Sequence, residues 1–412
     1  MYTKKIAYFL IFSLVLGFSS VAHGASEDTR YLVKSGNGFW KKSFGVRNEF
    51  SEGFTSDLTD WQLRLAKVFN LEVVPVKKLF ILTDEVKARP EALEELNKYG
   101  GLEIEGTKVT SPVPGRFIPS DRIPWGIESV YGNNPSLIKT SGGTDVNVAV
   151  LDTGVFREHT DLKRRVVQCK DFTSPKQSVV DGKCEDKNGH GTHVAGIISA
   201  DGGEDGKGIY GVAPESSLYA YKVCGNNGSC WSDDVAIAIR TAADQDANII
   251  NLSLGGDIES SLIKDAISYA VNKNVLIVAA AGNDGPDEAS IDYPGANSDV
   301  IAVGAFDVSY EVAEWSSRGL NSATLPNVIE EGDIEFSAPG VIIESTWKDG
   351  SYVVLSGTSM AAPHVSGLAA KLWQKDAEDP DLSTRALLKR FSKDIIPPIG
   401  EDNNSGYGFP SL

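Results

Sequence analysis

The strongest constraint on the fold is a series of short, mostly apolar strands separated by helical stretches. Such strands occur at residues 146–151, 248–254 and 275–280, and helical apolar spacing occurs at residues 233–243 and 262–271. Strands that are apolar along their whole length have both faces covered. Alternation with helices is typical of a mostly parallel sheet with helices on both faces. From about residue 116 the chain is therefore predicted to form an α/β domain.

The preceding part of the chain, residues 25–115, has a different pattern that predicts a small α+β domain. The order of elements is strand, helix, strand, strand, helix, strand, which is the order of a split-βαβ domain. A Ser-Pro-Val-Pro-Gly segment at residues 111–115 is typical of a linker. The six elements are expected at residues 31–33, 58–68, 71–76, 79–83, 91–99 and 102–109.

The N-terminus predicts export. Lys4 and Lys5 precede an apolar run at residues 6–18, and small residues follow up to Gly24. This is the pattern of a signal peptide over residues 1–24, and the run is short for a transmembrane helix, so an uncleaved anchor is the weaker alternative. We expect a secreted protein, extracellular or periplasmic in a host with an outer membrane, without stable membrane association.

Composition argues against one class of partner. The 412 residues carry a formal net charge of −17. An acidic protein has no general attraction to phosphate backbones or anionic lipid, so nucleic-acid binding is not expected.

The cysteine count is even, which suits an exported protein with disulfides. Four cysteines allow three connectivities, and the local pairs, which close short loops, are favoured. A zinc site is the alternative, but the sequence has no CxxC or CxxH pair. The favoured pairs are Cys169–Cys184 and Cys224–Cys230.

Four residues in the α/β domain could together hydrolyse a peptide bond. The reaction needs a nucleophile, a base, an anion that orients the base, and donors for the oxyanion. Asp152 and Asn283 each follow an apolar strand, where the working residues of parallel sheets lie. His190 lies in a glycine-flanked loop that enters a helix, and Ser359 opens a helix whose N-terminus favours negative charge.

The motifs around these residues resemble those of the subtilisin-like serine peptidases. They occur in the family order, and Asp, His and Ser follow one another as in subtilisin rather than as in chymotrypsin. The resemblance covers roughly residues 120–410. The five motifs are Asp152-Thr153-Gly154, residues 188–196 around His190, residues 251–255, residues 280–283, and Gly357-Thr358-Ser359-Met360-Ala361.

The resemblance implies a role for each residue. Ser359 would be the nucleophile, His190 the general base and Asp152 the residue that orients it, with Asn283 in the oxyanion hole. His193 and His364 are expected to pack structurally.

The resemblance also implies where a peptide substrate binds. The segment Ser253, Leu254, Gly255 and Gly256 would pair with the substrate as a strand, and Gly228 lies in the segment expected on the opposite edge. The Cys224–Cys230 bridge either stiffens that edge and places Trp231 near the S4 pocket, or only closes a loop. The two readings are equally open.

The same resemblance suggests a P1 preference, P1 being the residue that precedes the cleaved bond. Asp284 would lie at the mouth of the S1 pocket and Asp292 near its base. Two carboxylates around one pocket favour Arg or Lys at P1. Arg116 and Arg122 fall where self-cleavage could release the domain of residues 116–412.

Subtilisin-like enzymes are made with a propeptide that assists folding and inhibits, and residues 25–115 would have that role here. Calcium is the implied cofactor, with a solvated acidic loop as the alternative. The chain is expected to be a monomer that binds protein or peptide substrates and its own propeptide. The expected calcium ligands are Asp161, Asp201, Glu204 and Asp205.

Three functions from different classes remain to be weighed. An active endopeptidase is favoured over a catalytically silent homologue that binds proteins, because the four candidate residues are intact. An extracellular adhesive module would be expected to contain repeats, which we do not find. The acidic stretch at residues 321–335 has no functional interpretation.

Overall fold

The computed structural model describes residues 29–83, 123–132, 134, 136–204, 207–321, 328–394 and 402–412. The chain divides into two compact units, residues 1–76 and 77–412. None of the helices in these ranges is long and apolar enough to cross a membrane. The predicted signal peptide, the elements expected at residues 91–99 and 102–109, and the linker lie outside the described residues.

The first unit is a four-stranded antiparallel sheet with two helices. The strand order is β2-β3-β1-β4, and the elements follow one another as strand, helix, strand, strand, helix, strand. This is the order expected, but from other residues, since only the elements predicted at residues 31–33, 58–68 and 71–76 coincide with elements of this unit. That order is already complete at Pro75, well before residue 109. In chain order the elements are β1 (Arg30–Val33), α2 (Gly38–Phe44), β2 (Glu49–Phe50), β3 (Gly53–Asp57), α3 (Asp60–Val68) and β4 (Val73–Pro75).

Local capping explains the two helices. The Asn37 side chain accepts a hydrogen bond from the Phe39 N–H and begins α2. Thr59 and Gln62 form a capping box at the start of α3. Helix α2 was not predicted, because seven residues are too few to show helical periodicity, although Trp40 and Phe44 bury its apolar side.

The second unit is built around an eight-stranded sheet of order β15-β14-β13-β11-β6-β9-β7-β8. All neighbouring pairs are parallel except β7 with β8, so the predicted α/β class is confirmed. The strands are β6 (Asn147–Asp152), β7 (Val166–Asp171), β8 (Val180–Asp181), β9 (Ser217–Lys222), β11 (Ile249–Leu252), β13 (Leu276–Ala280), β14 (Ile301–Phe306) and β15 (Phe336–Pro339).

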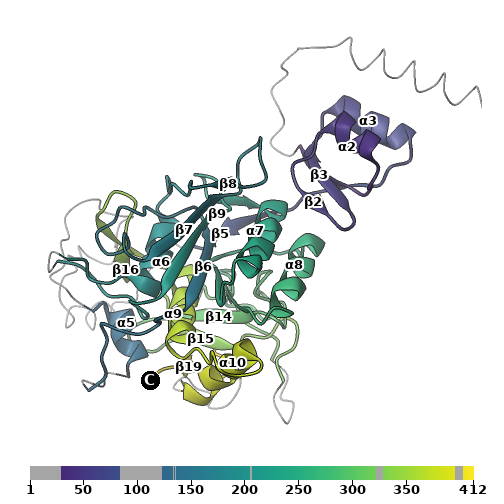
Figure 1. Ribbon diagram of the computed structural model, residues 1–412. Coiled ribbons are helices and arrows are strands. Elements are labelled where there is room, and N and C mark those ends of the chain that lie inside the picture. The colour runs from purple at the N-terminus through teal and green to yellow at the C-terminus, as the bar shows by residue number, and fades with distance from the viewer. Residues whose placement is uncertain are drawn as a thin grey trace, which may run out of the picture. The chain divides into compact units, whose positions relative to one another are not determined.

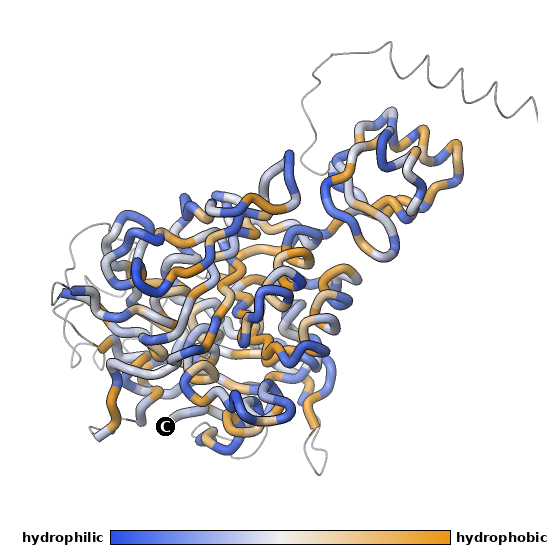
Figure 2. The backbone as a smooth tube through the Cα atoms, viewed as in Figure 1, coloured by the Kyte–Doolittle hydropathy of each residue, from blue (hydrophilic) through white to orange (hydrophobic). Residues whose placement is uncertain are grey.

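Helices cover both faces of this sheet (Figure 1). Helices α6 (His190–Ser199) and α9 (Thr358–Lys371) pack together on one face, and α7 (Ser232–Asp244) and α8 (Ser261–Val271) pack together on the other. Hydrophobic segments concentrate in the strands and hydrophilic ones in the surrounding loops (Figure 2). The remaining elements of this unit are α5 (Trp125–Val130), α10 (Pro380–Phe391), and the hairpin strands β16 (Ile343–Thr346) and β17 (Tyr352–Leu355), with β18 (Ser392–Lys393) and β19 (Phe409–Pro410).

A separate three-stranded sheet in this unit contains a strand that was expected to belong to the N-terminal domain. Strand β5 (Lys78–Ile81) lies between β10 (Ser229–Trp231) and β12 (Leu254–Gly255) and is antiparallel to both. The segment predicted as a strand at residues 79–83 therefore pairs within the second unit. Its partners lie far along the chain, which is why the order of elements alone misassigned it.

Both favoured disulfides, Cys169–Cys184 and Cys224–Cys230, are present in the structure. They account for all four cysteines, and no free cysteine is found.

Candidate active site

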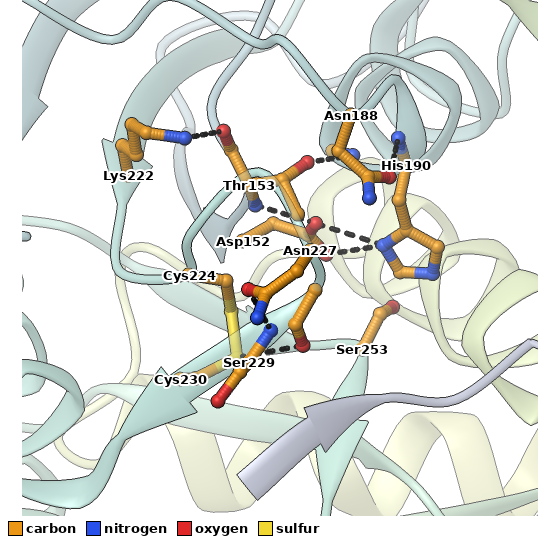
Figure 3. The surroundings of a disulfide bond; sticks show 12 residues. Asp152, Thr153, Asn188, His190, Lys222, Cys224, Asn227, Ser229, Cys230 and Ser253 are labelled. Atoms are coloured by element: carbon orange, nitrogen blue, oxygen red, sulfur yellow. Dashed lines mark hydrogen bonds and ion pairs between the residues drawn. A yellow bond between two sulfur atoms is a disulfide. The ribbon is translucent and has the colours of Figure 1, made fainter. Parts of the chain in front are cut away.

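A buried carboxylate and imidazole meet where β6 ends and α6 begins. Asp152 is the last residue of β6 and His190 is the first residue of α6. The His190 Nδ1 lies 2.8 and 3.0 Å from the two Asp152 carboxylate oxygens, and both side chains are buried (Figure 3). With Nδ1 held by the carboxylate, Nε2 is free to accept a proton. Among the described residues Nε2 has no hydrogen-bond partner.

A second buried carboxylate, which the sequence analysis missed, holds this arrangement in place. The Asp186 carboxylate accepts hydrogen bonds from the Thr153 hydroxyl, the Gly189 N–H, and both the N–H and the hydroxyl of Thr192. It thus ties the residue after Asp152 to the first turn of α6. The sequence signal that could have identified Asp186 is its position four residues before His190, in the segment Asp-x-Asn-Gly-His.

Ser359 lies in the first turn of α9, at the end where backbone N–H groups have no partner four residues earlier in the helix. Its hydroxyl donates to the Ser253 carbonyl oxygen (2.9 Å) and accepts from the Leu82 N–H (3.1 Å). Gly357 precedes the helix with φ +152°, and a Cβ there would lie 2.3 Å from the Leu82 carbonyl oxygen. Glycine is required at this position so that a peptide backbone can approach Ser359.

Asn283 lies beside the start of α9. Its side-chain oxygen accepts hydrogen bonds from the N–H (3.1 Å) and hydroxyl (2.9 Å) of Thr358. The side-chain amide nitrogen is therefore the end left to donate. Thr358 had no assigned part in the sequence analysis, although it lies within the Gly-Thr-Ser motif.

Buried polar contacts join β11 to α9 behind Ser359. Asn251 donates to the Ser253 hydroxyl, which donates to the Ser359 carbonyl oxygen, and Ser366 donates to Asn251. These three hydrogen bonds were not predicted. They hold the end of β11 against the first turns of α9.

The two segments expected to bind substrate are the neighbours of β5. Leu254 and Gly255 pair with Ile81 and Phe80, and the Gly228 carbonyl oxygen accepts from the Ile81 N–H at 3.1 Å. Gly256 instead pairs with Tyr293. The Cys224–Cys230 disulfide starts from the central residue of β10, and the Cys224 N–H donates to the Asp152 carbonyl oxygen at 3.1 Å (Figure 3).

Three carboxylates cluster near Gly255. Ligand atoms of Asp257, Asp284 and Asp292 lie within 4.8 Å of one another, a spacing that suits one shared cation, either a metal ion or a charged side chain. A Cβ on Gly255 would lie 2.9 Å from Asp292 Oδ2 and 3.0 Å from Leu82 Cδ1, so both side chains pack against Gly255. Burial raises the pKa of Asp292 to about 7, with further contributions from the charges of Asp284 and Asp257.

The residues expected to bind calcium fit that role unequally. Asp161 is buried, and its Oδ1 and the Gly202 carbonyl oxygen both lie close to Gly208, where a Cβ would be 2.5 and 2.3 Å from them. Its Oδ2 accepts hydrogen bonds from the Ile209 N–H and the Tyr352 hydroxyl. These are ligand types that calcium prefers. Asp201 and Glu204, however, are ion-paired with Arg164. Asp205 lies outside the described residues.

The two remaining histidines of the motifs are buried and held by backbone groups. His193 Nε2 lies 3.0 Å from the carbonyl oxygens of Ile343 and Val353, and His364 Nδ1 lies 2.8 Å from that of Met360. Burial lowers the pKa of His193 to about 3 and that of His364 to about 4. Both side chains are therefore neutral at physiological pH.

Comparisons with known proteins agree with this site. The model of the subtilase family matches residues 143–408. A subtilisin from Bacillus sp. (strain TA39) is 44% identical over 390 residues, which cover 90% of this chain and 87% of that protein. The major intracellular serine protease of Bacillus subtilis (strain 168) is 39% identical over 65% of this chain and 81% of its own length. The structure of sphericase is similar with a TM-score of 0.67 and 49% identity, over 71% of this chain and 99% of that one.

Proposed function

The chain belongs to the subtilase family and is a subtilisin-like serine protease, and from this premise we propose that it is a secreted endopeptidase made as a zymogen. One observation carries the proposal. The strand β5 is paired on both edges, and the residue that follows it, Leu82, donates its N–H to the Ser359 hydroxyl, as a peptide substrate would.

We assign the chemistry as follows. The Ser359 hydroxyl attacks the carbonyl carbon of the peptide bond, and His190 Nε2 takes its proton. Asp152 holds the Nδ1–H and stabilises the imidazolium that forms. In the structure the Ser359 hydroxyl donates to the Ser253 carbonyl, so it turns toward His190 when the substrate is attacked. Hydrogen bonds of this kind commonly tighten only in the reacting complex.

The oxyanion is proposed to bind to the Ser359 N–H and the Asn283 side-chain amide. The Ser359 N–H already faces the Leu82 carbonyl oxygen at 3.4 Å. Thr358 fixes the other end of the Asn283 side chain, so that the donor is pre-oriented. The corresponding donor in a subtilisin contributes about 3 to 4 kcal/mol to transition-state stabilisation.

The acidic cluster supports a preference for Arg or Lys at P1. Asp292 packs against Gly255 on the same side as the Leu82 side chain, and the Asp284 and Asp257 carboxylates cluster with it. A guanidinium or ammonium group would satisfy the charge of this cluster, whereas an acidic side chain would be repelled.

Residues 1–24 are proposed as the signal peptide, 25–115 as the propeptide and 116–412 as the peptidase domain. The two disulfides suit an oxidising compartment. The similarity to the TA39 subtilisin spans 90% of this chain and so includes most of its N-terminal part. The propeptide is proposed to inhibit the monomeric enzyme until it is removed.

A structural calcium ion is proposed at Asp161 and the Gly202 carbonyl oxygen, two oxygen ligands that both lie close to Gly208. Such an ion would stabilise the loop that follows α6 and takes no part in the reaction. Asp201 and Glu204 are weaker ligands for it, because Arg164 occupies their carboxylates.

Casein cleavage tests the proposed function. The wild-type protein should cleave casein and lose this activity with a serine-directed phosphonate, and Ser359→Ala should neither cleave nor mature. His190→Ala should be similarly inactive. A folded Ser359→Ala protein with normal processing and casein cleavage would contradict the proposal. A folded but inactive wild-type protein would favour the catalytically silent homologue.

A further inference from the structure

We propose that the first self-cleavage of this chain breaks the Leu82–Thr83 peptide bond, and that residues from Thr83 to about 115 are removed in a later step. This inference rests on the proposed function, because the same Ser359 makes the cut. It adds a processing site that lies well before Arg116 and Arg122, and it makes maturation a sequence of two cleavages. Leu82 does not follow the basic P1 preference proposed for separate substrates, because its covalent attachment and the pairing of β5 place it at Ser359.

The organisation of the chain places the end of the N-terminal unit close to Leu82. The strand, helix, strand, strand, helix, strand order of that unit is complete at Pro75, the last residue of β4. Only Val76 and Lys77 separate it from β5, which begins at Lys78. The segment that enters the cleft is therefore the direct continuation of a finished domain.

The backbone of β5 is held from both sides as a substrate strand. On one side Leu79 pairs with Cys230, and on the other Phe80 pairs with Gly255. Hydrogen bonds continue beyond the strand, since the Ile81 N–H donates to the Gly228 carbonyl oxygen at 3.1 Å. This register brings the next residue, Leu82, to the nucleophile.

Leu82 has the contacts of a P1 residue. Its carbonyl oxygen lies 3.4 Å from the Ser359 N–H nitrogen, and its own N–H donates to the Ser359 hydroxyl at 3.1 Å. Its Cδ1 packs against Gly255, 3.0 Å from where a Cβ on that residue would lie. The next Cα, that of Thr83, borders Gly357 at the start of α9. The peptide bond beside Ser359 is therefore the one between Leu82 and Thr83.

The side chains along β5 alternate as a bound peptide requires. Leu79 is 3% exposed and lines an apolar pocket with Ile263 and Ile267. Phe80, the next residue, is 54% exposed and points away from the cleft. Because successive side chains of a strand point to opposite faces, this pattern fits a segment held in one register.

The chemistry of the first step balances with water as the only co-reactant. Ser359 Oγ forms an ester with the Leu82 carbonyl carbon while the Leu82–Thr83 C–N bond breaks. The hydroxyl proton passes through His190 Nε2 to the Thr83 nitrogen, which leaves as a free amine. Water then hydrolyses the ester, giving the Leu82 carboxylate and restoring the Ser359 hydroxyl.

A refolding time course tests the order of cleavage. The full chain is purified in denaturant, refolded by dilution under oxidising conditions and sampled into acid, and the fragments are identified by intact mass and N-terminal sequencing. The expected first pair of products ends at Leu82 and begins at Thr83. Products that begin at residues 116–123 should appear only afterwards.

Three variants sharpen the test. Thr83→Pro leaves β5 intact but makes the bond after Leu82 resistant, and Leu82→Asp places a carboxylate against Asp292. Each should delay the Thr83 N-terminus at least tenfold. Val68→Asp adds the same charge at an exposed position at the end of α3, outside β5, and should leave the first cut at Leu82–Thr83 with its wild-type rate.

Two outcomes would overturn the inference. One is a first N-terminus at any position other than Thr83. The other is a product that begins at position 83 and forms at the wild-type rate in both Thr83→Pro and Leu82→Asp. In either case a casein-cleaving enzyme would leave the proposed function intact. A refolded wild-type chain that cleaves neither itself nor casein would instead refute the proposed function.

Discussion

Asp186 shows how much of the site depends on a residue outside the catalytic set. It lies buried between the loop that follows β6 and the first turn of α6, and it accepts from groups in both. It contacts neither Ser359 nor a substrate, so it is a positioning residue. Its carboxylate keeps His190 next to Asp152 by fixing the two segments that carry them.

We expect Asp186→Asn to lower the free energy of unfolding by about 2 kcal/mol or more, because an amide cannot accept all of these hydrogen bonds and leaves buried donors unpaired. Urea unfolding in the Ser359→Ala background, where self-digestion cannot occur, measures the loss. Glu185→Gln removes an exposed neighbouring carboxylate and should change stability by less than about 0.5 kcal/mol. Equal effects of the two substitutions would contradict this role.

Asp292 is the residue that the P1 preference depends on most. We expect kcat/KM for peptides with Arg at P1 to exceed that for Leu or Phe, and Asp292→Asn to lower the Arg-to-Leu ratio about tenfold, or about 1.4 kcal/mol. Asp287→Asn, which removes an exposed carboxylate of the same loop, is the control and should leave the ratio unchanged. If wild-type enzyme cleaved after Leu or Phe tenfold better than after Arg, the preference would be wrong.

Among the elements, β10 is notable because it contains Cys230, which forms a disulfide with Cys224. Cys230 is its central residue and pairs with Leu79 of β5, while Cys224 anchors the bridge beneath. The bridge closes a loop whose two cysteines are 6 residues apart. The bridge therefore ends on the strand that pairs with β5, and we expect it to stiffen that edge, the first of the two roles left open by the sequence.

The two disulfides should differ in their effect on catalysis. Replacing Cys224 and Cys230 with Ser should raise KM several-fold for peptides long enough to pair with β10, with a smaller change in kcat. It should also cost about 2 kcal/mol of stability. Replacing Cys169 and Cys184 should lower stability by about 3 kcal/mol and leave KM unchanged. The measurement is steady-state kinetics on two peptides, one with two and one with four residues before the cleaved bond. Identical KM values in the wild-type protein and both double variants would refute the role proposed for the Cys224–Cys230 bridge.

At the scale of the whole molecule, buried histidines couple stability to pH. The pKa of His364 is about 4 in the folded state against an ordinary value of 6.5, because burial disfavours the charged ring. The native state therefore binds fewer protons than the unfolded state between these values. This contribution is fully present above pH 6.5 and is lost as the pH falls toward and through 4.

We expect the free energy of unfolding to decrease from pH 6.5 to pH 4, with His364 accounting for about 3 kcal/mol of the change. In the Ser359→Ala background, His364→Gln should take up about one proton fewer on unfolding in this range. Urea titrations at several pH values give the slope. An unchanged slope in the variant would show that His364 does not contribute.

Calcium should also act on the whole molecule, since a ligand that binds only the native state raises its apparent stability. We expect a longer half-life of thermal inactivation in calcium than in chelator. Asp161→Asn should abolish the difference, and Asp376→Asn, an exposed carboxylate elsewhere, should preserve it. Equal half-lives of the wild-type protein in calcium and chelator would count against the site.

Much of this protein could be predicted from sequence because the decisive signals are local. Apolar strands alternating with helices predicted the α/β sheet, and short spacings favoured the two disulfides that the structure contains. The motifs also predicted the local positions of two site residues, since Asp152 ends a strand and His190 begins a helix. Periodicity and motif chemistry are readable within a few residues, so they need no knowledge of packing.

Tertiary structure alone decided which distant segments meet. Leu82 and Ser359 are 277 positions apart, and no local pattern distinguishes a strand of the N-terminal sheet from one that enters the cleft. The partners of the acidic residues were likewise decided by packing. Asp201 forms an ion pair with Arg164, whereas Asp161 Oδ1 lies with the Gly202 carbonyl oxygen close to Gly208. Strand pairing and the partners of buried charges depend on the geometry of the packed chain, which residue types in sequence order do not contain.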